Sequence, residues 1–274
     1  MGEAKGIGLH IGLNEVNPNH YQGWDGKLLA CEADAKDMLA ITSGRGFKTS
    51  TLLTRAATSE AVTAAIRDAA GRLGAGDLLV LSYSGHGGQV RDPSGEETDF
   101  LDETWVLWDR ELLDDELYAL WAAFKPGVRI LVLSDSCHSG TILRDRFYAN
   151  SPANATTSNR FKFIPRDVED RTYEANRATY DGLQRTFAQG DKIDVAASVV
   201  LISGCQDSQY SRDGDRNGLF TQRLREVWAD GAFDHGYRDF YRAIGSLMPP
   251  DQTPNYFRVG ATDRPFERQV PFTI

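Results

Sequence analysis

The sequence predicts an α/β fold in which a mainly parallel central sheet carries helices on both faces. Short apolar runs bounded by polar or glycine-rich turns indicate buried strands at 6–13, 77–83 and 128–133. Segments with helical spacing separate these runs, at 34–43, 59–73 and 114–124. Because strands that alternate with helices join into a parallel sheet through crossover connections, this order predicts the layered architecture.

The remaining elements follow in chain order. In the helix at 59–73, Ser59 can cap the first turn and Gly74 ends the last. A polar, acidic stretch at 89–109 predicts a hairpin excursion. Further strands are expected at 51–54, 198–203 and 256–259, and further helices at 220–228 and 237–247.

Length and composition favour one folded domain over residues 1–274. The chain has 274 residues, of which 41% are hydrophobic and 25% charged, as in ordinary globular proteins. The region at about 144–193 differs, because a polar run is followed there by a segment rich in arginine. Long insertions of this kind are usually functional, so we expect a loop-rich regulatory insertion.

Charge and cysteine content exclude several classes of protein. A net charge of −9 argues against nucleic-acid binding, which relies on basic side chains. No apolar run approaches the roughly 20 residues that a membrane span needs, and we see no signal peptide. The three cysteines lie far apart, so we expect neither a disulfide framework nor a zinc site. A reducing cytoplasm is the expected location.

Two strand exits carry residues with catalytic chemistry. Cys137 follows the strand at 128–133, and His86 follows the strand at 77–83 within a glycine-rich turn. The carboxyl ends of parallel strands meet at one edge of a sheet, where open α/β folds place their reactive groups. The two residues are separated by 51 positions, which matches the caspase spacing of about 50 between histidine and nucleophile.

The segments Tyr83–Gly87 and Asp135–Gly140 resemble the two catalytic signatures of caspase-type cysteine peptidases, above all the metacaspases and orthocaspases. The resemblance extends from about Ile7 to about Phe220 and is weaker at 144–193. It implies a caspase-like three-layer sandwich and a thiol protease made as a zymogen.

The chemistry assigns a role to each residue of the pair. Cys137 is the expected nucleophile and His86 the general acid and base, which deprotonates the thiol and later protonates the leaving amine. The backbone amides of Gly87 and Cys137 are the candidates for an oxyanion hole. Taken singly, an inert buried cysteine and a turn histidine are the alternatives. We interpret the adjacent His138 as structural.

Asp135 points to the substrate. Alternation along the strand places it on the same side as Cys137, where a carboxylate hinders thiolate formation unless a cation lies against it. A substrate Arg or Lys can be that cation. The resemblance implies that Asp135, Asp34 and Ser84 line a pocket for this residue, and helix capping is the alternative for Asp34. The expected partner is therefore a protein or peptide with a basic residue at the cleavage site.

The chemistry needs no cofactor, but the acidic stretch raises the question of calcium. In calcium-dependent metacaspases the aspartates that resemble Asp102, Asp114 and Asp115 bind the ion. The family has one more aspartate after the nucleophile's turn, where this chain has Arg144, with Asp145 next to it. The alternative is a solvated acidic face with a helix N-terminus that favours acids.

Two other functions and one mode of regulation follow from the same motifs. The alternatives are an asparagine- or aspartate-specific relative and an inactive caspase-like interaction module. We expect the segment at 144–193 to be cleaved by the enzyme itself or by an upstream peptidase. The candidate positions are Arg144, Arg146, Arg160 and Lys162, and an ordered, uncleaved insertion is the alternative.

Overall fold

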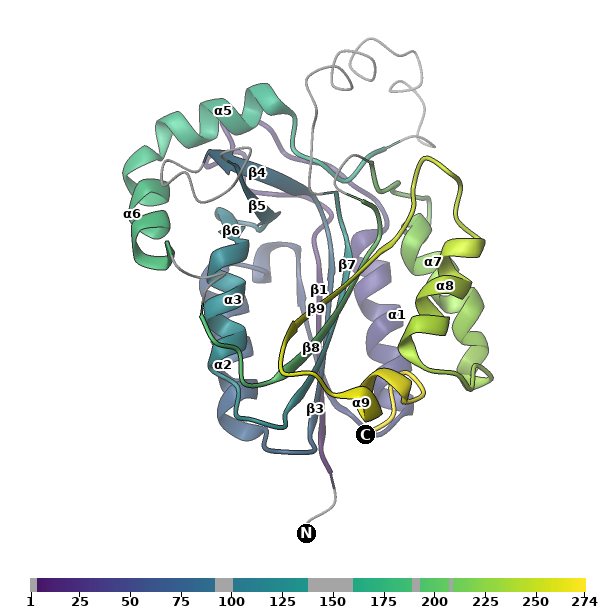
Figure 1. Cartoon of the computed structure of the whole chain (residues 1–274). Helices are drawn as coiled ribbons and strands as arrows, with labels where there is room; N and C mark the ends of the chain where they lie inside the picture. Colours follow the sequence, from purple (N-terminus) through teal and green to yellow (C-terminus); the bar gives the residue numbers. More distant parts are fainter. Residues whose placement is uncertain (1–3, 92–100, 138–159, 189–192, 207–208) are drawn as a thin grey trace.

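A six-stranded sheet forms the centre of the molecule (Figure 1). The structure is a computed structural model that describes residues 4–91, 101–137, 160–188, 193–206 and 209–274. The strand order is β2-β1-β3-β7-β8-β9, and every neighbouring pair is parallel except β8 with β9. The strands are β1 (Gly6–Gly12), β2 (Lys48–Leu53), β3 (Leu78–Ser84), β7 (Arg129–Asp135), β8 (Ser198–Ser203) and β9 (Asn255–Gly260).

Helices cover both faces of this sheet (Figure 1). On one face lie α2 (Ser59–Arg72) and α3 (Asp114–Ala122). On the other lie α1 (Cys31–Gly44), α7 (Leu219–Trp228), α8 (Tyr237–Ser246) and α9 (Arg264–Arg268). The described part of the chain also forms two short 3₁₀ turns, at Thr54–Ala56 and Ala229–Gly231. The predicted α/β class with a mainly parallel sheet is therefore confirmed.

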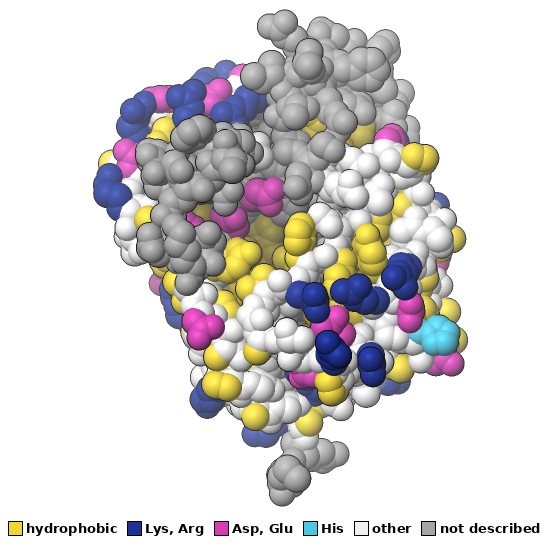
Figure 2. Space-filling view, viewed as in Figure 1, with side chains coloured by type: hydrophobic (Ala, Val, Ile, Leu, Met, Phe, Trp, Pro, Cys, Tyr) yellow, Lys and Arg dark blue, Asp and Glu magenta, His cyan; other side chains and the backbone are white. Residues whose placement is uncertain are grey.

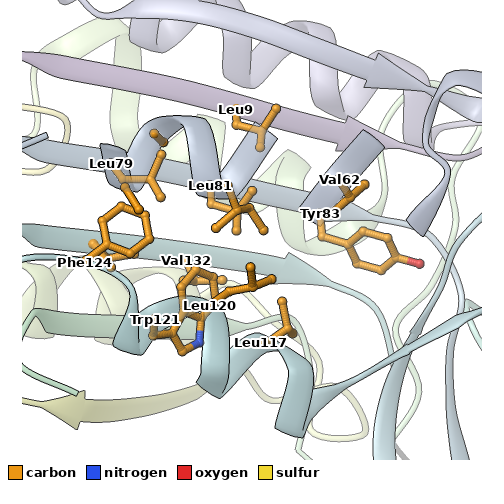
Figure 3. Close-up of a cluster of buried hydrophobic side chains, with 14 of the residues drawn as sticks. Leu9, Val62, Leu79, Leu81, Tyr83, Leu117, Leu120, Trp121, Phe124 and Val132 are labelled. Carbon is orange, nitrogen blue, oxygen red and sulfur yellow. The ribbon is translucent and has the colours of Figure 1, made fainter. Parts of the chain in front are cut away.

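Alternation along the strands builds two cores, one on each face of the sheet. Leu79 and Leu81 of β3 pack with Leu120 and Trp121 of α3 on one face (Figure 3). Their neighbour Val80 turns to the other face and packs in the cluster that α7 and α8 supply. Both faces of the central strands are buried, and for this reason the strands are nearly continuous apolar runs in the sequence.

A second, antiparallel sheet of three strands stands at the carboxyl end of the central sheet. It consists of β4 (Gly87–Arg91), β5 (Leu101–Val106) and β6 (Glu111–Leu113). β4 and β5 realise the hairpin expected at 89–109. The helices α5 (Arg166–Ala175) and α6 (Arg177–Phe187) lie beside it (Figure 1). Tyr173 and Tyr180 from these helices pack with Val90 and Leu113 of the sheet.

The insertion at 144–193 differs from the expected loop. Its described part, 160–188, contains two helices rather than loop. Basic and acidic side chains crowd the outer surface of α5 (Figure 2), and their density hid the apolar spacing of Val168 and Tyr173. Residues 138–159 and 189–192 lie outside the described part. No helix among the described residues is long and apolar enough to cross a membrane.

Candidate active site

Strand pairing brings Cys137 and His86 to one edge. β3 and β7 are parallel neighbours, and Ser84 lies opposite Asp135 in their register. Two residues beyond this pair, the chain has His86 on one side and Cys137 on the other, and both are buried. Between them the backbones come close, because a Cβ on Gly87 would lie 1.7 Å from the Cys137 carbonyl oxygen. Only glycine fits this approach.

His86 is oriented by a backbone carbonyl. Its Nε2 lies 2.8 Å from the Gly26 carbonyl oxygen, which can only accept, so Nε2 carries the proton. The basic Nδ1 is buried and has no hydrogen-bond partner among the described residues. Burial lowers the pKa of His86 to about 4, so the imidazole is neutral at physiological pH. The ring of Trp24 packs against it at a centroid distance of 4.7 Å.

The two amides expected to form an oxyanion hole converge on one carbonyl. The Gly87 and Cys137 N–H groups each donate to the Lys162 carbonyl oxygen, both at 3.1 Å. Two donors aimed at one oxygen match the geometry that stabilises the oxyanion formed on attack at an amide.

The side chain of the same Lys162 occupies the predicted pocket. Its Nζ lies 3.1 Å from Asp34 Oδ2, 3.1 Å from Asp135 Oδ2 and 2.9 Å from Ser84 Oγ. All four side chains are buried. An ammonium group has three hydrogens to donate, and three oxygens surround it here. The structure therefore brings the three predicted pocket residues together around one cation.

Electrostatics keep this lysine charged. Burial lowers the pKa of Lys162, but Asp135, Cys31, Asp34 and Asp213 together outweigh burial and raise it well above its ordinary value. Burial raises the pKa of Asp34, and Lys162 opposes that rise. The carboxylates of Asp34 and Asp135 also accept hydrogen bonds from the residues of the surrounding wall.

That wall supports each carboxylate separately. Asp34 accepts from the Asn217 side-chain amide at 2.9 Å and from the Gly218 N–H at 3.0 Å. Asp135 accepts from the hydroxyls of Ser211 and Thr221, at 2.6 and 2.9 Å. These donors do not depend on Lys162, so they can hold the pocket in shape around another cation.

The backbone around Lys162 runs through the site as an extended strand. On its amino-terminal side, the Lys162 N–H donates to the Ser211 carbonyl at 2.9 Å, and Phe161 pairs antiparallel with Arg212. On its carboxyl-terminal side, Phe163 pairs parallel with Gly87. The segment therefore adds a short strand to the site, in the way that extended peptides bind to exposed sheet edges.

The thiol of Cys137 lies beneath this strand. Its Sγ accepts from the Ser211 N–H. Cys137 belongs to a buried cluster with Cys205 and Tyr210, against which Phe161 and Phe163 pack. All three cysteines of the chain are free and buried. Cys137 is thus covered by the chain's own segment.

The residues proposed for calcium lie away from this pocket, in the second sheet and α3. Asp102 accepts from the Gln184 amide at 2.8 Å. Burial, followed by the nearby Asp102, Glu103 and Asp115, raises the pKa of Asp114 well above its ordinary value. Within the described ranges, no group of three or more His, Cys, Asp or Glu side chains is arranged to hold a metal. Arg144 and Asp145 lie outside those ranges, and calcium binding stays a prediction.

Sequence reasoning missed several residues of the site. Lys162 was one of four candidate cleavage positions in a long segment rich in basic residues, and nothing in its neighbours distinguished it. The sequence carries no signal for the Gly26 carbonyl, because every residue has a backbone carbonyl. The pocket-wall residues Ser211, Asn217 and Thr221 are common polar types far along the chain from the motifs. His138 lies outside the described residues.

A caspase-like α/β sandwich with a thiol, an imidazole, two convergent amides and an acidic pocket defines a cysteine peptidase domain. A sequence model of the caspase domain matches residues 16–266, and the chain therefore belongs to the caspase-domain family. Metacaspase-1 of Mycosarcoma maydis is 28% identical over 248 residues, which is 80% of this chain and 60% of that protein. Metacaspase-1 of Saccharomyces cerevisiae strain S288c is 29% identical over 84% of this chain and 57% of its own length. The chain thus spans about three-fifths of these relatives.

Solved structures agree on the fold. Protein GSU0716 from Geobacter sulfurreducens has 54% identity and a TM-score of 0.90, over 98% of both chains. Caspase-1 from Spodoptera frugiperda superimposes with a TM-score of 0.55 over 98% of this chain and 89% of its own, at 12% identity. At that identity the likeness concerns the fold, and the predicted caspase-like architecture is confirmed.

Proposed function

We propose that the protein is a cysteine endopeptidase that cleaves protein substrates after Lys or Arg through an acyl-enzyme on Cys137. The observation that carries this proposal is the position of Lys162. Its ammonium lies between Asp34 and Asp135, while its carbonyl oxygen accepts from two backbone amides. One residue thus fills a cation pocket and an oxyanion hole together, as the residue before a scissile bond would.

Each step of the reaction has a group to perform it. Neutral His86 accepts the proton of the Cys137 thiol as the sulfur attacks the carbonyl carbon. The amides of Gly87 and Cys137 stabilise the oxyanion, at about 3–4 kcal/mol for each donor. His86 then protonates the leaving amine, and water later hydrolyses the thioester. The Gly26 carbonyl holds the imidazole in the tautomer that this sequence requires.

The same geometry supports regulation as a zymogen. A substrate cannot enter the pocket while Lys162 fills it, so the segment must be cut or displaced. Of the four positions considered for cleavage, Arg144 and Arg146 lie outside the described residues. The carbonyl of Arg160 pairs with the Asp213 N–H. We therefore assign self-cleavage to the Lys162–Phe163 bond, and an upstream activating peptidase would cut in the preceding segment.

The dyad is tested by substitution. Cys137→Ala and His86→Ala should each lower peptidase activity at least a thousandfold, because one removes the nucleophile and the other the proton carrier. Hydrolysis of fluorogenic lysine and arginine peptides measures this, and circular dichroism checks the fold. Cys31→Ala serves as the control, since it removes another buried thiol. Appreciable turnover by the Cys137→Ala protein would contradict the assignment.

Specificity is tested at the pocket. Asp135→Asn should cost about 3 kcal/mol, or roughly a hundredfold in kcat/KM for lysine peptides, because it removes one partner of a buried charge pair. Asp68→Asn, at an exposed surface pair on α2, is the matched control. Retained lysine cleavage by the Asp135→Asn protein would overturn the pocket assignment.

The same peptide panel separates the alternatives. Preference for Asn or Asp peptides would identify the asparagine- or aspartate-specific relative. An inactive interaction module would cleave no peptide, and Cys137 would resist active-site alkylation after the segment is cut.

A further inference from the structure

The leaving-group side of the Lys162–Phe163 bond is held as firmly as the acyl side. The Phe163 ring packs on Tyr210 at a centroid distance of 4.7 Å. The Ile164 N–H donates to the Gly87 carbonyl at 3.0 Å. The Ile164 side chain is buried in a cluster with Val16, Tyr21, Val106 and Val168, against which Trp24 packs. These contacts hold the two residues after the bond independently of the bond itself.

The helices that follow add anchors further along the chain. Glu169 of α5 accepts from the Gln89 N–H of β4. Tyr180 of α6 accepts from the Glu111 N–H of β6 at 3.2 Å and contacts His20 at 3.0 Å. Breaking one peptide bond removes none of these contacts. The amine of Phe163 would therefore stay beside the site after it leaves the carbonyl.

The acyl side is also fixed. The Lys162 ammonium keeps its three oxygen partners, and the Lys162 N–H keeps the Ser211 carbonyl. The Trp24 ring packs against both the His86 ring and the cluster that holds Ile164, so the proton carrier lies beside the same anchor. Nucleophile, carbonyl, amine and proton carrier thus remain together.

We propose that this site also catalyses aminolysis, re-forming the Lys162–Phe163 peptide bond from the acyl-enzyme. In the forward step a C–S bond forms between Cys137 and Lys162, the C–N bond breaks, and His86 gives its proton to the departing amine. In the reverse step the Phe163 amine attacks the thioester, the C–S bond breaks, and the amine's proton passes to the thiolate through His86. No other reactant is consumed.

The physical reason is competition between a held amine and water. Well-oriented reacting groups reach effective molarities of about 10⁵–10⁸ M, far above the molarity of liquid water. Water is further disfavoured, because Cys137 is fully buried beneath the segment. Acylation therefore reverses many times before hydrolysis occurs. Capture of the thioester by water, rather than acylation, then limits net self-cleavage.

This inference rests on the proposed function, and a trapping experiment on the full-length protein tests it. Hydroxylamine attacks a thioester and leaves a hydroxamate at Lys162, which mass spectrometry distinguishes from the hydrolytic carboxylate. If re-formation dominates, hydroxylamine should raise the total rate of appearance of the fragment 163–274 at least tenfold. An unchanged total rate would mean that every acylation already ends in hydrolysis, which overturns the proposal.

Controls exclude the alternative explanation, in which a slowly hydrolysed thioester accumulates without re-forming the peptide bond. Protein unfolded in acid and only then treated with hydroxylamine should give no fragments, and a fragment burst would count against re-formation. Ile164→Ala should loosen the anchor, raise hydrolysis and reduce the hydroxylamine effect. Arg171→Ala, at an exposed ion pair on α5, should behave as wild type. If Ile164→Ala fails to fold, the ratio of the wild-type cleavage rates with and without hydroxylamine still tests the proposal.

The outcomes also separate this inference from the proposed function. Cleavage of lysine peptides without any hydroxamate at Lys162 leaves the peptidase assignment intact and removes re-formation. If no self-cleavage occurs in any arm and lysine peptides are not cleaved either, both the peptidase assignment and re-formation are wrong. Cys137→Ala should give no fragment in any arm.

Discussion

Two pairs of buried acids lie near the candidate active site, and their charges are neutralised in different ways. The pocket pair, Asp34 and Asp135, encloses the Lys162 ammonium. The helix-side pair, Glu111 of β6 and Glu169 of α5, meets around Gly88, where a Cβ would lie 2.9 and 2.8 Å from their oxygens. Arg166 contacts Glu169 at 2.8 Å, but Oε1 of Glu111 has no hydrogen-bond partner among the described residues.

The difference shows what each pair is suited to hold. Side-chain and backbone donors surround both carboxylates of the pocket, and the Lys162 ammonium lies between them, so this pair suits a cation. Among the described residues the helix-side pair accepts from fewer donors: Thr104 donates to Glu111, and the Gln89 N–H and Arg166 donate to Glu169. Burial raises the pKa of Glu111 to about 7, and burial together with Glu111 raises that of Glu169. These two carboxyls therefore suit a proton, and the comparison can be tested from both sides.

The largest effect is expected at the pocket. Lys162→Ala in a Cys137→Ala background should lower the free energy of unfolding by about 3–5 kcal/mol, because it leaves two buried carboxylates without their cation. Urea denaturation at pH 7 measures the change, and Lys162→Arg is the charge-preserving control. A loss no larger than that of an exposed lysine would show that the pocket acids need no cation.

A smaller effect is expected on the helix side, and it depends on pH. The pKa of Glu111 is about 7 in the folded protein and 4.5 as the ordinary value. Since it is raised on folding, its stabilising contribution is present below pH 4.5 and is lost as pH rises through 7. Wild type should lose up to about 3 kcal/mol relative to Glu111→Gln between pH 4.5 and 8. Parallel stability profiles of the two proteins would contradict this.

The contributions of the buried histidines cancel in that difference. Burial lowers the pKa of His10 to about 3 and that of His86 to about 4. Both therefore favour the folded state above about pH 6.5 and lose this contribution as pH falls. Because both variants contain these histidines, comparing the two profiles removes their contribution and leaves that of the coupled pair Glu111 and Glu169.

The smallest effect concerns a third acidic group, Asp102, Asp114 and Asp115. If it binds calcium, millimolar calcium should raise the unfolding free energy by about 1.4 kcal/mol at tenfold excess over Kd, and should raise activity. Asp114→Ala should remove both effects. Identical Tm values and rates in calcium and in chelator would contradict calcium binding by these acids and restrict specific cation binding to the pocket.

The features that were predicted correctly are those that a local sequence pattern determines. The strands around 77–83 and 128–133 and the turns that follow them are set by neighbouring residues, and strand order then brings His86 and Cys137 to one edge. The three pocket residues came from the family resemblance. The path of Lys162 into the pocket depends on contacts with Ser211 and Gly87, distant along the chain, so no local signal marks it. β6, α5, α6 and α9 were missed because they are short or highly charged.

The contact that orients His86 has a consequence for evolution. Its acceptor is the main-chain oxygen of Gly26, so no side-chain replacement can delete it. A mutation can disrupt this contact only by changing the backbone conformation around Gly26 or by replacing His86. Gly26 has a φ of +55°, and a Cβ there would meet Trp24 at 2.9 Å. The contact therefore depends on the conformation of one glycine. A contact made by a carboxylate side chain could instead be abolished by many single substitutions of that residue.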